Sequence, residues 1–287
     1  MKKILLATTL IAASAGFAAA EVAVSGTARM GVADLGTVHG AQFNSRIRII
    51  FTASGETDGG LSFGGSVRND QSGVGNTEND DSTVYISGAF GKLTMGDTGN
   101  AADALVGQVS GVGYTSLNSL NELPWIATPK TGALYEYSAG ALTFALGSSQ
   151  VSSLAGTSST MSAAAKYATD AYSIALGYED NSAIGSQVSV LGSAAFSGAT
   201  IKAKVANFDS AAAGVDAITA YALSVDYAIN GVGLTAFYSD NGAAVDPAAY
   251  GIGASYDLGG GASVVGGIVK ADAIKNTMFD LGVKMSF

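Results

Sequence analysis

The chain has 287 residues, of which 48% are hydrophobic and only 13% charged, whereas soluble domains carry charge on about a quarter of their residues. It has no cysteine and a single histidine, His39, which exclude disulfide bonds and histidine-cluster metal sites and argue against a Ser-His-Asp triad. The formal net charge of −9 argues against binding to nucleic acid or to an anionic membrane surface.

Residues 1–20 have the pattern of a secretory signal peptide. Two lysines open the chain, an apolar run follows, and Ala18 and Ala20 are small residues at positions −3 and −1 of a cleavage site. We therefore expect an exported protein whose mature chain begins at Glu21. Loss of the two lysines would change the net charge from −9 to −11. A short buried helix is the alternative for this segment.

From Glu21 to the C-terminus, apolar and polar residues alternate with a period of two, as in strands with one apolar and one polar face. In FNSRIRIIF, for example, Phe43 and Ile47 share one face while Arg46 and Arg48 share the other. The same alternation recurs at 21–34, 60–70, 172–180, 200–208, 217–229, 248–258 and 279–287. The pattern predicts a protein made mainly of β-strands.

The connections between these strands alternate in length. Tight turns rich in glycine alternate with longer acidic or serine-rich loops, as in outer-membrane barrels. After the first 20 residues we find no apolar run long enough for a transmembrane helix, and a closed barrel is the remaining way to satisfy every backbone group in lipid. We therefore predict that residues 21–287 form one domain, an all-β, 16-stranded antiparallel transmembrane β-barrel.

One segment interrupts this rhythm. Residues 97–132 are too long for an ordinary hairpin connection, contain a short helical stretch near 101–107 and include the only tryptophan, Trp125. Long irregular insertions in compact folds are usually functional or disordered. Because the segment is rich in apolar side chains, we expect it to fold into the barrel as a constriction loop rather than extend into solvent.

All the arginines of the chain fall on the polar face of the first three predicted strands: Arg29, Arg46, Arg48 and Arg68. The expected hairpins place Arg29 opposite Arg46, and Arg48 beside Arg68. A soluble sandwich can carry such residues on its wet face, but a water-filled barrel also explains the apolar opposite face, whose solvent is then lipid. We predict that the arginines form a basic wall lining a pore, where charge sets ion preference.

Lysines of the same parity would extend this basic wall: Lys166, Lys202, Lys204 and Lys284. The alternative is that they are scattered lysines with little effect on selectivity. The candidates for an opposing acidic side are Asp97, Asp103 and Glu122, and we expect the arginines to lie within reach of Asp103 and Glu122; ordinary solvated acids are the alternative. The acidic stretch 78–82 lacks the ligand spacing of a calcium loop, so we expect no metal site.

Three stretches, SGAFGKLTMGD (87–97), YGIGASYDLGGGASVVGGI (250–268) and the terminal LGVKMSF, carry a resemblance to the general-diffusion porins of Gram-negative outer membranes, in particular the purple-bacterial, Rhodobacter-type branch. The resemblance implies a homotrimer of 16-stranded barrels whose third long loop, here 97–132, narrows the pore. It also identifies Phe287 with the terminal aromatic that is read by the barrel-insertion machinery. This chain has fewer acidic residues in that loop than is usual for the family.

We therefore expect a passive, water-filled channel for small hydrophilic solutes and ions in the outer membrane, without catalytic residues or cofactors. Its expected partners are lipid, the insertion machinery and identical subunits, and not nucleic acid. A barrel enzyme is a second hypothesis, but a single histidine makes a nucleophile-and-base pair hard to assemble. A secreted adhesive β-protein is a third, and it would not explain apolar faces on nearly every strand.

Overall fold

A computed structural model describes residues 21–72, 76–78, 81–126, 132–151 and 158–287 of the chain, and the structural statements below concern these residues. The expected signal peptide, residues 1–20, and part of the acidic stretch 78–82 lie outside them. Within the described ranges, no helix combines the length and the apolar character needed to cross a membrane.

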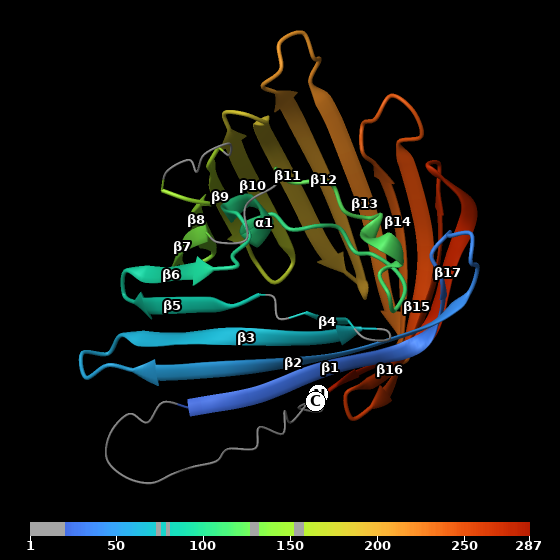
Figure 1. Cartoon of the computed structure of the whole chain (residues 1–287), viewed down its shortest axis with the longest axis horizontal. Helices are drawn as coiled ribbons and strands as arrows, with labels where there is room; N and C mark the ends of the chain where they lie inside the picture. Colours follow the sequence, from blue (N-terminus) through green and yellow to red (C-terminus); the bar gives the residue numbers. More distant parts are fainter. Residues whose placement is uncertain (1–20, 73–75, 79–80, 127–131, 152–157) are drawn as a thin grey trace.

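The strands form a ring that closes on itself (Figure 1). Apart from β4 and β5, each strand pairs antiparallel with the next, and β17 pairs with β1. Both β4 and β5 pair with β3, so they are two pieces of one interrupted strand, and the 17 strands of the described residues make a barrel of 16. The strands are β1 Glu21–Asp34, β2 Gln42–Glu56, β3 Ser62–Ser72, β4 Asn76–Glu78, β5 Thr83–Gly88, β6 Gly91–Gly96, β7 Gly132–Ala139, β8 Leu142–Ser148, β9 Thr160–Ala168, β10 Tyr172–Asn181, β11 Gly185–Phe196, β12 Ala199–Ser210, β13 Ile218–Ile229, β14 Val232–Asp240, β15 Ala248–Gly259, β16 Ala262–Ala271 and β17 Ile274–Ser286.

The outer face of this barrel is apolar and exposed. More than 60% of the surface of Val24, Ile252 and Leu281 is accessible. Such exposure is unfavourable in water, because burial of apolar area is worth about 25 cal/mol per Å², but it matches the lipid-facing band of a membrane barrel. The predicted alternation is thus confirmed, with lipid as the solvent of the apolar face.

Tyrosines gather near both ends of the outer face, as the aromatic girdles of a membrane barrel do. Near the short turns, the rings of Tyr167 and Tyr172 lie 6.0 Å apart, and at the other end the rings of Tyr221 and Tyr238 are also 6.0 Å apart. Further tyrosines also lie on strands of the barrel: Tyr135, Tyr137, Tyr178, Tyr227, Tyr250 and Tyr256.

The connections follow the predicted alternation of short turns and long loops. In the turn between β13 and β14, Asn230 and Gly231 both have positive φ angles, of 50° and 80°, the conformation that a two-residue hairpin needs. The C-terminus closes the ring beside β1, since the backbone N–H of Gly26 donates to Phe287 O and that of Phe287 donates to Gly26 O, at 2.7 and 3.0 Å.

The registers of the first hairpins bear directly on the arginines. Arg29 lies opposite Arg46, as predicted. Arg48 lies opposite Asp70 and Arg68 lies opposite Ile50. Arg48 and Arg68 are thus diagonal neighbours that both contact Asp70, so the expectation that they lie beside each other is confirmed, although they are not directly opposite. The second hairpin closes later than expected because its turn is built around residues 57–61, where the N–H of Thr57 donates to the carbonyl of Leu61.

The segment after β6 contains the helix α1, Ala101–Leu105, and a 3-10 turn η1, Leu117–Ser119. The predicted helical stretch is confirmed at α1, and Asn100 caps it by accepting a hydrogen bond from the N–H of Asp103. Between α1 and η1 the segment runs along the inner side of the strands (Figure 1). Its apolar side chains pack on inward-facing alanines of the wall, such as Ala145 and Ala175.

Candidate functional site

A buried carboxylate ties both ends of the inner loop to the barrel wall. Glu179 of β10 is 0% exposed. Its Oε1 accepts hydrogen bonds from Asn100 Nδ2 at 2.6 Å and from the N–H of Ile126 at 3.1 Å, and its Oε2 accepts from Gln187 Nε2 at 3.1 Å. Because a buried carboxylate is costly unless it is well bonded, these donors fix the start and the end of the loop at one point of the wall.

Lys204 of β12 makes a second attachment point. Its Nζ lies 3.3 Å from the centroid of the Trp125 ring, a cation–π contact, and donates to Gln108 Oε1 at 2.8 Å. Gln108 in turn bonds both backbone groups of Leu123, which joins the outgoing and returning arms of the loop. Lys204 faces inward as its parity predicted, but at 1% exposure it is covered by the loop and is not an open part of the basic wall.

The acidic residues of the loop lie close to Lys204 and not to the arginines. Asp103 and Glu122 both act electrostatically on Lys204, so the expectation that they lie within reach of the arginines is wrong. Desolvation in the loop raises the pKa of Asp103, while Lys204 and a hydrogen bond with the Trp125 side chain oppose the shift. The reason is the path of the loop, which places its acids beside β10–β12, across the barrel from β1–β3.

The tip of the loop, residues 110–120, bonds to carboxylates on β13 and β17. Lys202 Nζ donates to Ser110 Oγ at 2.9 Å, and Ser110 Oγ donates to Asp226 Oδ2 of β13 at 2.6 Å. The N–H and the hydroxyl of Thr115 both donate to Asp280 Oδ2 of β17 at 2.7 Å. The loop therefore follows the inner wall as far as β17. Lys202 is one of the wall residues that bond to the loop.

Glycines on two neighbouring strands make room for the aromatic ring at the tip. A Cβ atom on Gly31 of β1 or on Gly282 of β17 would lie 2.9 Å from the ring of Tyr114. Burial and the charge of Asp280 raise the pKa of the Tyr114 hydroxyl, while Arg29 lowers it. The carbonyl of Tyr114 accepts a hydrogen bond from Arg29 Nη1 at 3.3 Å, so the tip ends at the first strand of the basic wall.

On β2 and β3 the arginines have acidic partners of their own. Arg48 donates through two nitrogens to the carboxylate of Asp70, at 2.8 and 2.6 Å. Arg68 lies 3.1 Å from the same carboxylate and also pairs with Asp81. Two-point pairing of this kind is strong and geometrically specific. These two arginines are thus largely neutralised by β3 and by the loop that follows it.

The remaining predicted site residues are spread over the structure. Arg46 is partly exposed on the inner face of β2 beside Arg29. Asp97 lies at the end of β6, where its N–H donates to the carbonyl of Ser82, and no ion pair joins it to the arginines among the described residues. Lys166 and Lys284 share the inward parity of their strands, opposite Ala175 and Arg29 respectively.

Residues that the sequence-based reasoning did not select prove central to this arrangement: Asp70, Asp81, Glu179, Asp226 and Asp280. Four of them lie on strands, and their parity alone would have placed them on the inner face beside the basic residues. Asp81 lies between β4 and β5, in the interruption of that strand, where no periodic signal exists.

We expect Asp70→Asn to shift the ion preference of the pore toward anions. Asp70 is the one carboxylate shared by Arg48 and Arg68, so its loss leaves two guanidinium groups with one acidic partner. Loss of a bonded partner also destabilises the fold by about 1–3 kcal/mol. The measurement is the zero-current potential across a salt gradient, and an inward carboxylate without an arginine partner, in Asp257→Asn, is the control. Equal shifts of the zero-current potential in the two variants would show that the pairing of Asp70 with the arginines does not set the ion preference.

An apolar outer face, two aromatic girdles, no open edge and a charged interior together define a membrane-spanning β-barrel of the outer-membrane type. The charges of the interior require water, because unpaired ions in a dry interior are strongly unfavourable. The class of protein is therefore a barrel with an aqueous interior partly filled by its own loop.

Comparisons with known proteins identify the family within this class. The family of Gram-negative porins matches residues 7–274. A porin of Rhodobacter capsulatus is 39% identical over 93% of this chain and 100% of its own length. A porin structure refined at 1.8 Å resolution superposes with a TM-score of 0.78 at 34% identity, over 93% of this chain and 100% of that one. The porin of Rhodopseudomonas blastica, at 22% identity over the same shares, has the same fold with a TM-score of 0.78.

The chain belongs to the family of Gram-negative porins. It is a channel of the Gram-negative outer membrane for passive diffusion and not an enzyme. The predicted barrel, function and location are confirmed, and the hypotheses of a barrel enzyme and of a secreted adhesive protein are wrong.

Proposed function

We propose that small hydrophilic solutes and ions pass between the inner loop and the arginine-bearing wall formed by β1–β3. The observation that carries this proposal is the path of the loop. Its hydrogen bonds reach β9 to β14 in succession, and then β17 and β1. The bonds found in the described residues do not extend to β2 or β3, so the water-filled space is bounded by the loop on one side and the basic wall on the other.

The charges on these two sides would set a modest ion preference. Acidic residues at the strand ends beside the long loops, such as Asp34 and Asp240, concentrate cations at the mouth. That effect is screened over about 8–10 Å in physiological salt. The arginines lie deeper, at the level of the loop, where screening is weaker. Solutes are thus sorted by size at the loop and by charge at the wall.

The test is planar-bilayer recording of the purified protein. We expect stepwise, ohmic channels with weak cation preference, and we expect Arg46→Ser combined with Arg48→Ser to make that preference stronger, most visibly in concentrated salt. Lys92→Ser, which removes an inward charge near the short turns, is the control. If the double variant and the wild type have the same zero-current potential at every salt concentration, the arginines do not line the narrow part of the passage.

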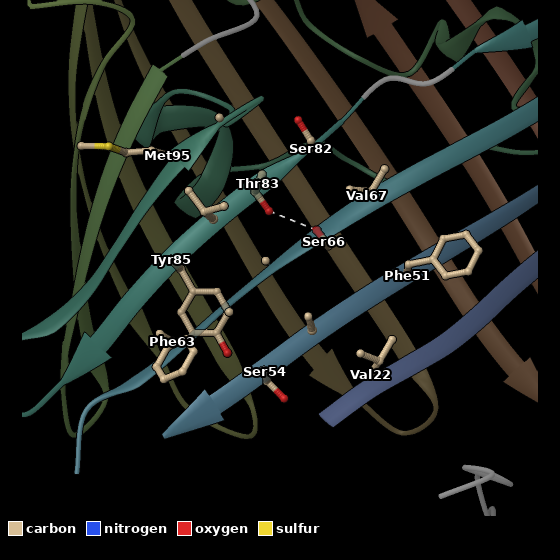
Figure 2. A pocket seen from close by; sticks show the side chains of 15 residues that line it. Val22, Phe51, Ser54, Phe63, Ser66, Val67, Ser82, Thr83, Tyr85 and Met95 are labelled. Atoms are coloured by element: carbon tan, nitrogen blue, oxygen red, sulfur yellow. Dashed lines mark hydrogen bonds between the residues drawn. The ribbon is translucent and has the colours of Figure 1, made fainter. Parts of the chain in front are cut away.

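We further propose that the barrel assembles as a homotrimer through the outer face of β1–β6. Only six residues each form β5 and β6, whereas a membrane-spanning strand needs about 9–11. The adjoining hollow has a volume of about 750 Å³. Figure 2 shows Phe51, Phe63 and Val67 among the side chains around it. A low, hollowed wall is poorly matched to lipid and is better covered by a second copy.

Single cysteines can test this contact because the chain has none of its own. We compare Val67→Cys on the proposed face with Ile252→Cys on β15, outside that face, positions that are 52% and 64% exposed in the single subunit. A lipid-soluble maleimide should label the Val67 variant much more slowly in the native oligomer, and equally fast after heating dissociates it. Equal rates before heating would place the interface elsewhere.

Two further proposals concern export and assembly. Cleavage after Ala20 is checked by N-terminal sequencing of the protein from outer membranes, which should begin at Glu21. The role of Phe287 as a signal for the insertion machinery is supported by its place at the closing seam of the barrel.

A further inference from the structure

Three basic side chains form one row across the inner face of β17, β1 and β2. In the strand registers, Lys284 lies opposite Arg29, and Arg29 lies opposite Arg46. Side chains directly opposite one another on neighbouring strands have Cβ atoms about 4.5–5.5 Å apart. Three positive charges therefore face the same small volume, at the depth where the tip of the loop meets the wall.

This row differs from the arginines beside it. Arg48 and Arg68 are paired with Asp70 and Asp81, whereas no ion pair to Arg29, Arg46 or Lys284 occurs among the described residues. Within the part of the chain that the structure describes, Arg29 donates to the carbonyl of Tyr114 alone, and its Nε is buried without a hydrogen-bond partner. Because neighbouring cations without paired carboxylates repel one another, a ligand with negative charge would stabilise them.

A polar hollow adjoins the row at Lys284. It has a volume of about 320 Å³ and lies between the loop backbone at 111–113 and the inner face of β14–β17. Ser255 and Ser263 line it together with Lys284, and Ser263 lies directly opposite Lys284 in the register. Hydroxyl groups beside an ammonium group are donors suited to phosphate oxygens.

The nearby carboxylates compensate the row only in part, since Asp280 and Asp70 act electrostatically on Arg29, and Asp70 also acts on Arg46. Asp280 Oδ2 is occupied by two bonds from Thr115, and Asp226 accepts from Ser110 and from a threonine of β14. Asp257 lies two strands away from Lys284, since Ser263 stands between them, and it accepts from the N–H of Gly259. Because Asp70 is already shared by Arg48 and Arg68, the three cations of the row keep an excess of positive charge.

We propose that Lys284, Arg29 and Arg46, with the adjoining serine-lined hollow, form a binding subsite for phosphate-bearing small solutes on the pore wall. The proposal rests on the passage proposed above and names a class of solute for it. Binding is weak and reversible, because a solute that is held tightly would not leave the pore. The subsite raises the local concentration of such anions at the loop and so assists their passage through a channel whose mouth is acidic.

The experiment measures the current through single channels in planar bilayers while glucose 6-phosphate or glucose is added to one side. With the wild type, glucose 6-phosphate should lower the open-channel current along a saturable curve, and glucose at equal concentration should not. Lys284→Gln and Arg46→Gln should each raise the half-saturating concentration on the order of tenfold, the effect of losing one charge-assisted hydrogen bond. Lys166→Gln, which removes an inward charge on β9, should leave the curve unchanged.

Each result decides a separate point. If the protein forms no channels, the proposed passage fails together with the subsite. If channels form but glucose 6-phosphate and glucose act alike, or if Lys166→Gln weakens the effect as much as Lys284→Gln does, the passage stands and the subsite is wrong. Heat-resistant migration of every variant on gels shows that the barrel is intact, and if one variant is unstable the other tests the row alone.

Discussion

Removal of the loop tip is expected to raise single-channel conductance by a factor on the order of two and to admit larger sugars, because conductance follows the cross-section of the narrowest aqueous passage. The structure shows where to cut. The two arms of the loop meet where Asn121 Nδ2 donates to Val109 O at 2.7 Å, so residues 110–120 can be replaced by two glycines that bridge this short gap.

This truncation leaves the attachment of the loop intact. The contacts of Glu179 with both loop ends and of Lys204 with Trp125 lie on the retained side of the cut. The strand groups that lose partners, such as Asp280, become exposed to pore water and are solvated by it. A gain in conductance is therefore attributable to the missing tip and not to an unfolded loop.

The control shortens a loop outside the barrel interior. Residues 213–216, between β12 and β13, are exposed, and their deletion should leave conductance unchanged. The measurements are single-channel conductance and the swelling of proteoliposomes in sugars of increasing size. If the truncated protein assembles and conducts like the wild type, the tip does not narrow the passage.

Deletion of Phe287 is expected to abolish most assembly of the barrel in the outer membrane. Phe287 supplies the last pair of backbone hydrogen bonds between the C-terminus and β1, at Gly26. Without it the seam is shorter and leaves unpaired groups at its end, which are costly where lipid replaces water. The same deletion removes the terminal aromatic that the insertion machinery is proposed to read.

Two substitutions separate these causes. Phe287→Ala keeps the backbone bonds of the seam but loses the ring, and Phe287→Tyr keeps both the bonds and an aromatic ring. If recognition of the ring dominates, the alanine variant should fail nearly as completely as the deletion, and the tyrosine variant should assemble. The quantity measured is heat-modifiable protein in purified outer membranes. Normal levels after deletion of Phe287 would show that the residue is not needed for assembly.

The barrel and its two faces were determined by the sequence alone. Alternation with a period of two decides which side chains point outward, because neighbouring residues of a strand necessarily face opposite sides. Phe43 and Ile47 could therefore be placed in contact with lipid, and Arg46 and Arg48 on the inner face, without coordinates. The same rule would have placed Glu179 and Asp280 inside.

Only the tertiary structure decided which inner groups meet. Arg48 pairs with Asp70 because the second hairpin turn closes later than its residues suggested, and a small change in the turn shifts every cross-strand partner. Asp103 and Glu122 lie near Lys204 because an irregular loop has no periodicity from which its path could be inferred; its course is set by long-range contacts, such as the seat of Tyr114 on Gly31. Strand parity is a local property of the chain, whereas partners across a barrel depend on turn geometry and on packing between distant segments.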